Sequence, residues 1–310
     1  MSKPSFVFRW LAAVLYPALL LGGCALASVL LQYGLGEAVT GALTLLVVVV
    51  VLSLLEHFMP YTSAWRPNRR TVRIDLTHSL VSAAVASPLV RITGVVFAAW
   101  LGGKLSGLLG STLWPSTWPL VLQVALGVVV ADLGVYCAHR WMHATSVGWR
   151  VHAVHHSPAR LYAVAGGRSH PLNAILTLTS EAVPVVLLGI TPEAYMLLLI
   201  FKAVNGMLQH SNIAMTPGPL SYVIATSDVH RFHHSTDLRE SNSNFGNATM
   251  IWDHVFGTFY LPHRRPAASV GISDADVPES YLAHLLTPFT LERYGRVGLP
   301  MRSQADVPPL

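Results

Sequence analysis

Long apolar segments separated by short polar stretches run through most of the chain. A helix needs about 20 mostly apolar residues to cross a bilayer, and six segments approach this length. They cover residues 10–31, 40–55, 76–101, 119–136, 172–188 and 193–204. The pattern therefore predicts an all-α fold, a polytopic membrane helical bundle.

Three of these segments depart from an uninterrupted run of about 20 apolar residues. Pro88 and Arg91 interrupt the third one, and the fifth and sixth are short and joined only by residues 189–192. Thr191 and Pro192 have the residue types of a helix N-cap and first position. This hairpin either spans the membrane twice or dips into it.

Basic residues predict the orientation. Lys3 and Arg9 precede the first segment, and Arg66–Arg73 follow the second; such residues favour the cytoplasmic side. The first apolar run exceeds the roughly 7–15 residues of a signal peptide, so we expect a retained helix. Alternation then places the ends of the fourth and sixth segments, and the chain after them, in the cytoplasm. We expect a multi-pass protein of the inner or plasma membrane in a bacterium, or of the endoplasmic reticulum in a eukaryote.

The amino-acid composition also indicates a membrane protein. Of 310 residues, 52% are hydrophobic and 11% charged, against about 25% charged in soluble proteins. The net charge is +5, but the arginines flank membrane segments, so we expect no nucleic-acid partner. Cys24 and Cys137 are far apart in the chain and suggest no disulfide framework.

Histidines supply the candidate chemistry. Spacings of three and four residues place side chains on one helix face, and neutral imidazole is a common metal ligand. Eight imidazoles exceed the four that saturate one tetrahedral zinc, so the pattern favours a two-metal centre in a cytoplasmic histidine-rich helical cap. The eight form the clusters HRWMH (His139, His143), HAVHH (His152, His155, His156) and HRFHH (His230, His233, His234).

Other residues extend this hypothesis. His210 follows the sixth segment on the same predicted face and is a candidate ninth ligand. His170 is a candidate additional ligand or gate residue, whereas His263 and His284 are expected on the surface. Asp132 and Asp253 could each accept a hydrogen bond from a ligand imidazole and orient it.

Five stretches carry a family resemblance: DLGVYCAHRWMHATSVGWRVHAVHHSP at 132–158, QHSN at 209–212, HRFHH at 230–234, NFGN at 244–247 and WDHVFGTFY at 252–260. Together they resemble the membrane-bound fatty acid hydroxylase and sterol desaturase superfamily. The resemblance implies two iron ions held by the clustered histidines, molecular oxygen as co-substrate and a lipid substrate. Some members carry a further histidine where this chain has Gly206, so that ligand is either missing or supplied by His170 or Asn205.

These observations predict an oxygen-dependent di-iron hydroxylase of a fatty acyl or sterol-like lipid. A desaturase is the alternative, and a membrane metal transporter a distant one; a metalloprotease would need the absent motif H-E-x-x-H. Neither a haem-binding domain nor a dinucleotide fingerprint is apparent, so electrons should come from a separate ferredoxin, cytochrome or reductase. The expected division is N-terminal transmembrane helices at 1–131, a fatty acid hydroxylase-like catalytic region at 132–263 and a tail at 264–310.

Overall fold

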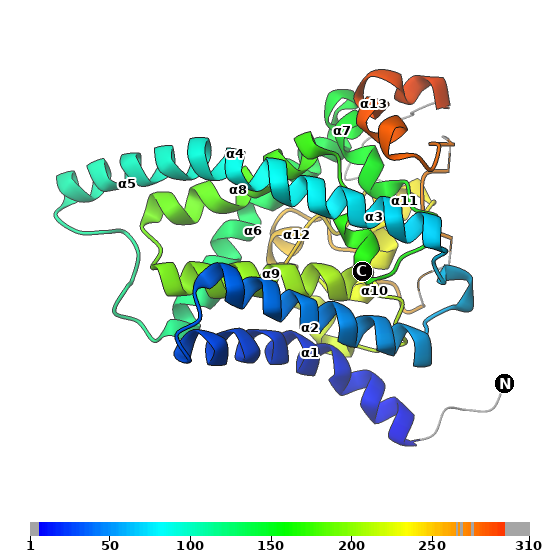
Figure 1. Ribbon diagram of the computed structural model, residues 1–310, viewed down its shortest axis with the longest axis horizontal. Coiled ribbons are helices and arrows are strands. Elements are labelled where there is room, and N and C mark those ends of the chain that lie inside the picture. The colour runs from blue at the N-terminus through cyan, green and yellow to red at the C-terminus, as the bar shows by residue number, and fades with distance from the viewer. Residues whose placement is uncertain (1–5, 265, 267–268, 274–275, 295–310) are drawn as a thin grey trace.

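The chain folds into helices joined by short loops (Figure 1). The computed structural model describes residues 6–264, 266, 269–273 and 276–294. Within these ranges the extended backbone forms only isolated bridges, such as that between Pro60 and Ile213. The α-helices are α1 (Phe6–Gln32), α2 (Glu37–Phe58), α3 (Arg69–Val81), α4 (Ser87–Val90), α5 (Val96–Leu109), α6 (Leu120–Ala144), α7 (Ser146–His156), α8 (Pro171–Leu188), α9 (Pro192–His210), α10 (Ser227–His233), α11 (Leu238–Ser241), α12 (Ile251–Val255) and α13 (Tyr281–Thr290).

Among the described residues, five helical stretches are long and apolar enough to cross a membrane, so the prediction of an all-α membrane bundle is confirmed. They are Trp10–Gln32, Glu37–Phe58, Arg69–Leu109, Leu120–Ala144 and Pro171–Leu188. The sixth predicted segment forms α9, which does not meet this criterion. Helix α9 packs against α1, α2 and α6. Because neighbouring helices cover it, α9 can carry polar residues such as Lys202 and Asn205, which a lipid-facing helix would hold at high cost.

The third stretch continues through the predicted interruption. Helices α3, α4 and α5 follow one another along Arg69–Leu109, joined by two π-helical turns, η2 (Ser82–Ala86) and η3 (Arg91–Val95). Pro88 is accommodated in the first turn of α4, where its missing N–H costs least. A π turn widens the helix locally and often marks a functional site.

Close helix contact fixes the centre of the bundle. Helix α8 crosses α6 at Gly134, where a Cβ atom would lie 1.9 Å from the Ser180 carbonyl oxygen. Only glycine permits this approach. On the other side of α9, buried residues of α1 (Tyr16, Leu20), α2 (Val48, Leu52) and α9 (Val204, Leu208) share one hydrophobic core. The N-terminal helices therefore pack directly against the helix that carries His210.

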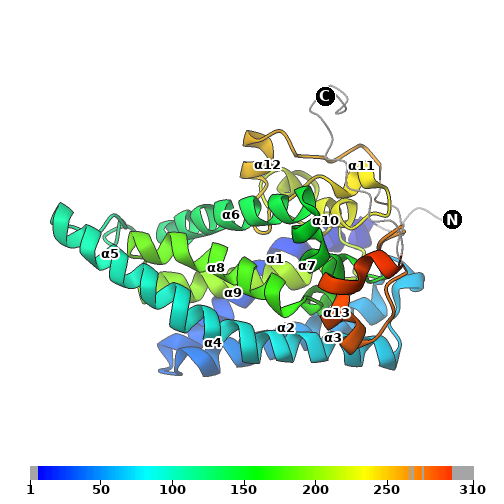
Figure 2. The same cartoon turned by 90° about the horizontal axis from the view of Figure 1, so that it is seen from above.

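The short helices gather at one end of the bundle. Figures 1 and 2 show α7, α10, α11 and α13 together at the end where α6 and α9 terminate. Each of the three histidine clusters lies at this end, on α6, α7 or α10. The arrangement brings histidines separated by nearly a hundred residues to one place.

Candidate metal centre

A tight turn positions the first two clusters. Thr145 ends α6 and begins α7, and its hydroxyl accepts the N–H of Gly148 at 3.1 Å. A Cβ atom on Gly148 would lie 2.6 Å from the Met142 Cα atom, so the turn requires glycine there. As a result, His139 on α6 faces His152 on α7, with their Nε2 atoms 3.0 Å apart.

A buried arginine positions the third cluster. Arg231 on α10 donates from Nη2 to the carbonyl oxygens of Ser211 and Ile213, each at 2.9 Å, and its guanidinium lies over the ring of Tyr61. These contacts dock α10 beside the end of α9. The neighbouring His230 consequently faces His210, with their Nε2 atoms 3.0 Å apart.

The nine predicted ligands converge in two groups, in each of which the ligand atoms lie within 4.8 Å of one another. The five-histidine group is His139, His143, His152, His156 and His233. The four-histidine group is His155, His210, His230 and His234. The rings of His156 and His234 stack across the two groups, with centroids 4.4 Å apart. The arrangement therefore offers two adjacent metal sites rather than one.

Each H-x-x-H-H cluster contributes to both groups. In HAVHH the outer pair, His152 and His156, enters the five-histidine group, and His155 enters the other. In HRFHH the outer pair enters the four-histidine group, and His233 enters the first. Residues four apart on a helix lie one above the other, whereas adjacent residues, such as the last two histidines of each cluster, point about 100° apart around the helix axis. The motif spacing thus explains how one short helix can serve two ions.

Four of these histidines place their Nδ1 atom against a backbone oxygen, which cannot donate. The partners are backbone carbonyl oxygens for His139 (Phe245, 2.9 Å), His155 (Arg168, 3.1 Å), His210 (Gly206, 2.8 Å) and His233 (Ser243, 2.8 Å). Because a carbonyl only accepts, each of these Nδ1 atoms carries the proton. Each opposite Nε2 atom is left with a lone pair, the form that binds a metal.

Contacts between the Nε2 atoms test whether a metal fits. The His143–His156 and His152–His156 pairs are both 3.1 Å apart. Two lone pairs cannot form a hydrogen bond, but two nitrogens bound to one ion at about 2.1 Å lie about 3.0–3.4 Å apart. Among the described residues, the buried His233 Nε2 and His234 Nδ1 atoms have no hydrogen-bond partner. The donor set therefore fits two cations that prefer imidazole, a class that includes iron.

Burial keeps these imidazoles neutral. The pKa of His155 is lowered to about 4, chiefly by burial, with the hydrogen bond to the Arg168 carbonyl opposing the fall and the charge of Arg168 adding to it. Burial also lowers the pKa of His156 and His234 well below the usual value, with neighbouring imidazoles adding to the effect. At neutral pH the imidazoles are therefore uncharged, and each has one nitrogen available as a ligand.

Asp132 and Asp253 hold a loop rather than an imidazole. Within the described chain, Asp132 accepts the N–H groups of residues 247–249 and the Thr249 hydroxyl. Asp253 accepts the N–H groups of Phe245 and Gly246 and the Thr258 hydroxyl. The expectation that each would bind a ligand imidazole directly is thus wrong. Both reach the site indirectly, because the loop between them carries the Phe245 carbonyl that binds His139.

His170 lies outside both groups. Its Nδ1 atom accepts the N–H of Leu172 and so caps α8, and its Nε2 atom contacts the Leu285 carbonyl at 3.3 Å. Both ring nitrogens are engaged, so the structure does not offer it as a ligand. Asn205 is also elsewhere, with its Oδ1 atom bound to Tyr16. Neither residue replaces the histidine missing at Gly206.

The two histidines expected on the surface, His263 and His284, differ in their exposure to solvent. His263 is exposed, but His284 is fully buried on α13, and its Nδ1 atom lies 2.9 Å from His78 Nε2. The expectation for His284 was wrong because α13 folds back onto α3 and α7. No local pattern around His284 indicates this long-range contact.

Several contributing residues have no clear sequence signal. The amide oxygens of Asn173 and Asn242 face Nδ1 of His152 (2.9 Å) and His143 (3.4 Å). Asn173 lies three residues after His170, in a segment where only the histidine drew attention. The carbonyl partners are backbone atoms, which any residue type could supply. Such contacts become visible only when the chain is folded.

A cavity of about 460 Å³ opens beside both groups. His139 and His152 of the first group and His155, His210 and His230 of the second line it. Its remaining wall includes hydroxyl and amide side chains of Ser79, Ser82, Ser87, Ser169, Asn173 and Thr177. Gly206 also lines it, and a Cβ atom there would meet no atom within 4 Å. A substrate in this cavity would therefore contact the metal-facing side of the histidines.

Comparisons with known proteins identify sequences similar to this chain. The model of the fatty acid hydroxylase family matches residues 124–258. Ornithine lipid hydroxylase OlsE of Rhizobium tropici is 34% identical over 255 residues, covering 80% of this chain and 74% of that protein. Alkylglycerol monooxygenase of Homo sapiens is 28% identical over 217 residues, covering 68% of this chain and 46% of that protein.

A sterol enzyme is more distant. Delta(7)-sterol 5(6)-desaturase of Candida glabrata is 26% identical over 143 residues, which are 46% of this chain and 37% of that protein. The chain thus spans about three quarters of the hydroxylase but less than half of the monooxygenase or the desaturase. No solved structure matches it.

Proposed function

The chain belongs to the fatty acid hydroxylase family, and from this premise we propose that it is a di-iron enzyme that uses molecular oxygen to hydroxylate a lipid. The observation that carries the proposal is the convergence of nine imidazoles in groups of five and four, with Nε2 atoms facing one another. Family membership makes the protein an oxidoreductase and selects iron from the metals that imidazole suits.

The protein's own residues would hold the metal ions, orient the ligand imidazoles and exclude water from the site. Carbonyl and amide oxygens fix the Nδ1 protons of six of the nine rings, each of which presents its Nε2 lone pair in a set direction; they are His139, His143, His152, His155, His210 and His233. The loop at residues 244–249, bound by Asp132 and Asp253, supplies the carbonyl for His139. When bound, reduced iron supplies the oxygen activation that an unreactive C–H bond requires. The cavity beside the histidines holds the lipid near that centre and limits the access of water.

The relatives suggest the substrate class. One is named for an ornithine lipid, another for alkylglycerol and a third for a sterol. We therefore place the substrate among membrane lipids, which enter the cavity from the bilayer. The electron donor is a separate ferredoxin, cytochrome or reductase. The basic residues before the first apolar segment (Lys3, Arg9) and after the second (Arg66–Arg73) support an active site on the cytoplasmic side. The division into residues 1–131, 132–263 and 264–310 belongs to the same proposal.

Metal stoichiometry tests the ligand assignment. We expect two irons per chain in the purified protein. His230→Ala leaves three ligands in the four-histidine group, whereas His233→Ala leaves four in the other, enough for a tetrahedral site. Elemental analysis should therefore show a larger loss of iron for His230→Ala. His254→Ala, outside both groups, is the control. Full iron content in both ligand variants would contradict the assignment.

Lipid analysis tests the activity. Cells with and without the gene, supplied with isotopically heavy oxygen gas, should differ in a lipid that has gained one labelled oxygen atom. A lipid that has instead lost two hydrogen atoms would identify a desaturase, the outcome that the sterol relative supports. Identical lipids in both cells would contradict both activities. A purified chain that turns over with NAD(P)H alone would contradict the separate electron donor.

A further inference from the structure

A second cavity adjoins the one at the metal centre. It measures about 450 Å³ and lies between the α3–α5 stretch, α8 and α9, with Glu37 of α2 at its far end. We call it the membrane groove. Ser87 and Leu178 line both cavities, so the groove and the metal-centre cavity adjoin at these two residues. A single elongated molecule that passes these side chains would occupy both.

The two cavities are lined by different residue types, although apolar atoms form most of the exposed wall of both. Aliphatic side chains line most of the membrane groove, including Val90, Val95, Ala182, Val186, Ile190 and Leu199. Serine, threonine, asparagine and histidine side chains line much of the metal-centre cavity. Since apolar chains favour an apolar environment, the groove suits a hydrocarbon chain, and the polar side chains of the metal-centre cavity can bind a polar group.

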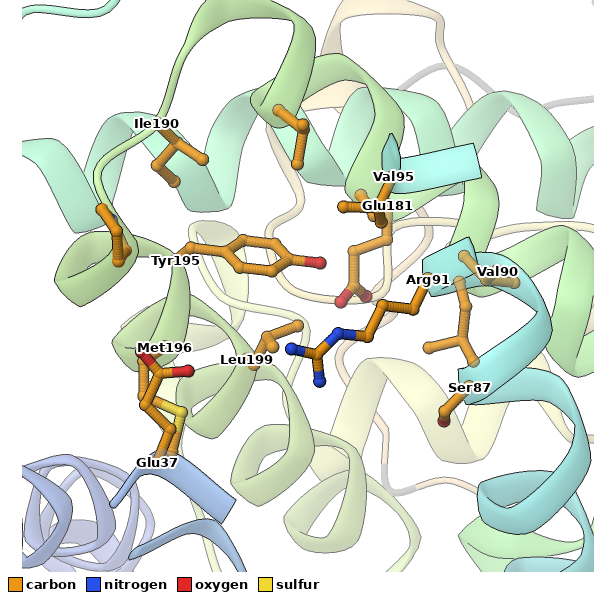
Figure 3. Close-up of a pocket in the computed structure, with 14 residues that line it drawn as sticks. Glu37, Ser87, Val90, Arg91, Val95, Glu181, Ile190, Tyr195, Met196 and Leu199 are labelled. Atoms are coloured by element: carbon orange, nitrogen blue, oxygen red, sulfur yellow. The ribbon is translucent and has the colours of Figure 1, made fainter. Parts of the chain in front are cut away.

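One cation stands within the membrane groove. Figure 3 shows the Arg91 guanidinium pointing into it, near the side chains of Tyr195 and Glu181. Arg91 lies 22 residues after Arg69 and 18 before Leu109, in the middle of a stretch able to span the membrane. A charged side chain at such a position is costly and marks a functional site. Arg91 also begins the π-helical turn η3, and such turns recur at functional sites.

Glu181 forms an ion pair with another residue. Its Oε2 atom lies 3.0 Å from the Lys202 Nζ atom, which also lies 3.8 Å from Asp132 Oδ1. No ion pair of Arg91 occurs in the described part of the chain. Arg91 therefore faces the cavity with no carboxylate in direct contact, and an anionic group on the occupant of the groove would be its direct partner.

We propose that Arg91 is an anion subsite that binds the carboxylate or phosphate group of a lipid lying across both cavities. Guanidinium suits either group, because its planar donors match two oxygens at once. The Tyr195 hydroxyl and the Ser87 hydroxyl are the nearby neutral groups able to complete the bonding. The inference rests on the proposed function only in taking that lipid to be the substrate.

The subsite also constrains where oxidation occurs. One turn of helix separates Arg91 from Ser87, which borders the metal-centre cavity. With the hydrocarbon chain in the apolar groove, the part of the lipid next to the anionic group lies nearest the histidines. Hydroxylation should therefore occur on the headgroup or on carbons next to it. A product hydroxylated near the methyl end of a chain would overturn this orientation.

Binding measurements test the subsite without turnover. The iron-loaded protein in detergent is titrated with radiolabelled hexadecanoate and hexadecanol, which share a chain and differ in charge. A second pair, dihexadecanoyl phosphatidate and dihexadecanoylglycerol, tests phosphate in the same way. A charge-assisted contact should favour at least one anionic lipid about ten- to a hundredfold over its neutral partner. Which pair shows the preference distinguishes a carboxylate from a phosphate.

Variants assign the preference to Arg91. Arg91→Gln should remove it, Arg91→Lys should keep part of it, and Arg73→Gln, an exposed arginine on the same helical stretch, should leave it unchanged. An equal preference in Arg91→Gln would overturn the proposal. So would the absence of any preference in the unaltered protein, which stays decisive if Arg91→Gln fails to fold. Normal anion binding without lipid oxidation would instead contradict the proposed function.

Discussion

His139 and Asp253 are linked by hydrogen bonds to the same backbone residue, Phe245. The His139 Nδ1 atom lies 2.9 Å from the Phe245 carbonyl oxygen, and the Phe245 N–H donates to the Asp253 carboxylate at 2.8 Å. Asp253 thus sets the position of a carbonyl that in turn orients a proposed ligand. Burial raises the pKa of Asp253 to about 6, and its hydrogen bonds from Thr258, Gly246 and Phe245 oppose this rise.

We expect Asp253→Asn to weaken metal binding without removing a ligand. The carboxylate accepts with both oxygens, whereas an amide accepts with one, so the loop loses a bond at Phe245 or Gly246. Losing a group that orients a ligand typically lowers metal affinity about 10- to 100-fold. Competition with a chelator measures the change. Asp237→Asn is the control, because Asp237 only caps α11 and asparagine caps equally well. Unchanged affinity in Asp253→Asn would contradict the role.

Gly206→His should strengthen the four-histidine group. Position 206 lies one turn before His210 on α9, and a Cβ atom there meets no atom within 4 Å. An added imidazole would supply a fifth ligand, so the ion should leave several-fold more slowly in a chelator. The same side chain would narrow the cavity and reduce turnover of bulky lipids. Gly206→Ala, which adds bulk without a ligand, should not slow the loss of metal; equal rates in both variants would refute the prediction.

Lys202 should be essential to stability. Its buried Nζ atom lies 3.0 Å from Glu181 Oε2 and 3.8 Å from Asp132 Oδ1. Lys202→Met leaves two buried carboxylates without their cation, a change that typically costs about 3–5 kcal/mol. The midpoint of thermal unfolding in detergent should fall markedly. Lys104→Met, on exposed α5 surface, is the matched control. An equal midpoint for both variants would show that the carboxylates need no lysine.

The buried His284 should make the attachment of α13 sensitive to acid. Burial, with the charges of Arg168 and His78, lowers its pKa from 6.5 to about 3. Below pH about 6.5 the unfolded chain therefore binds a proton that the folded chain excludes, and stability falls as pH decreases toward about 3. His284→Gln cannot take up this proton. Its unfolding midpoint should decline less between pH about 6.5 and about 4 than that of the unaltered protein.

The comparison needs a second histidine variant, because other buried imidazoles also contribute to acid sensitivity. His263 is exposed, so His263→Gln should follow the unaltered protein over the whole pH range. A decline in His284→Gln as steep as in His263→Gln would show that His284 does not govern this behaviour.

The sequence by itself determined which segments form apolar helices and which histidines are candidate metal ligands. Apolar runs indicate helices because the bilayer core satisfies no backbone polar group, and H-x-x-H-H indicates ligands because helical spacing aligns side chains. Even so, α9 is not apolar enough to qualify as a span, although its 19 residues exceed the 18 of α8, which does qualify. Its apolar pattern indicates burial, and the pattern is the same whether lipid or other helices surround the segment.

Only the tertiary structure decided how the histidines divide between two groups and what holds them. The split of HAVHH and HRFHH depends on how α7 and α10 face each other, a contact between segments about eighty residues apart. The Phe245, Arg168 and Ser243 partners are backbone carbonyls, and Asp132 and Asp253 bind backbone N–H groups. Every residue type offers these atoms, so no sequence pattern marks them. Long-range packing, which brings Arg91 and the histidines to one adjoining pair of cavities, is likewise absent from local periodicity.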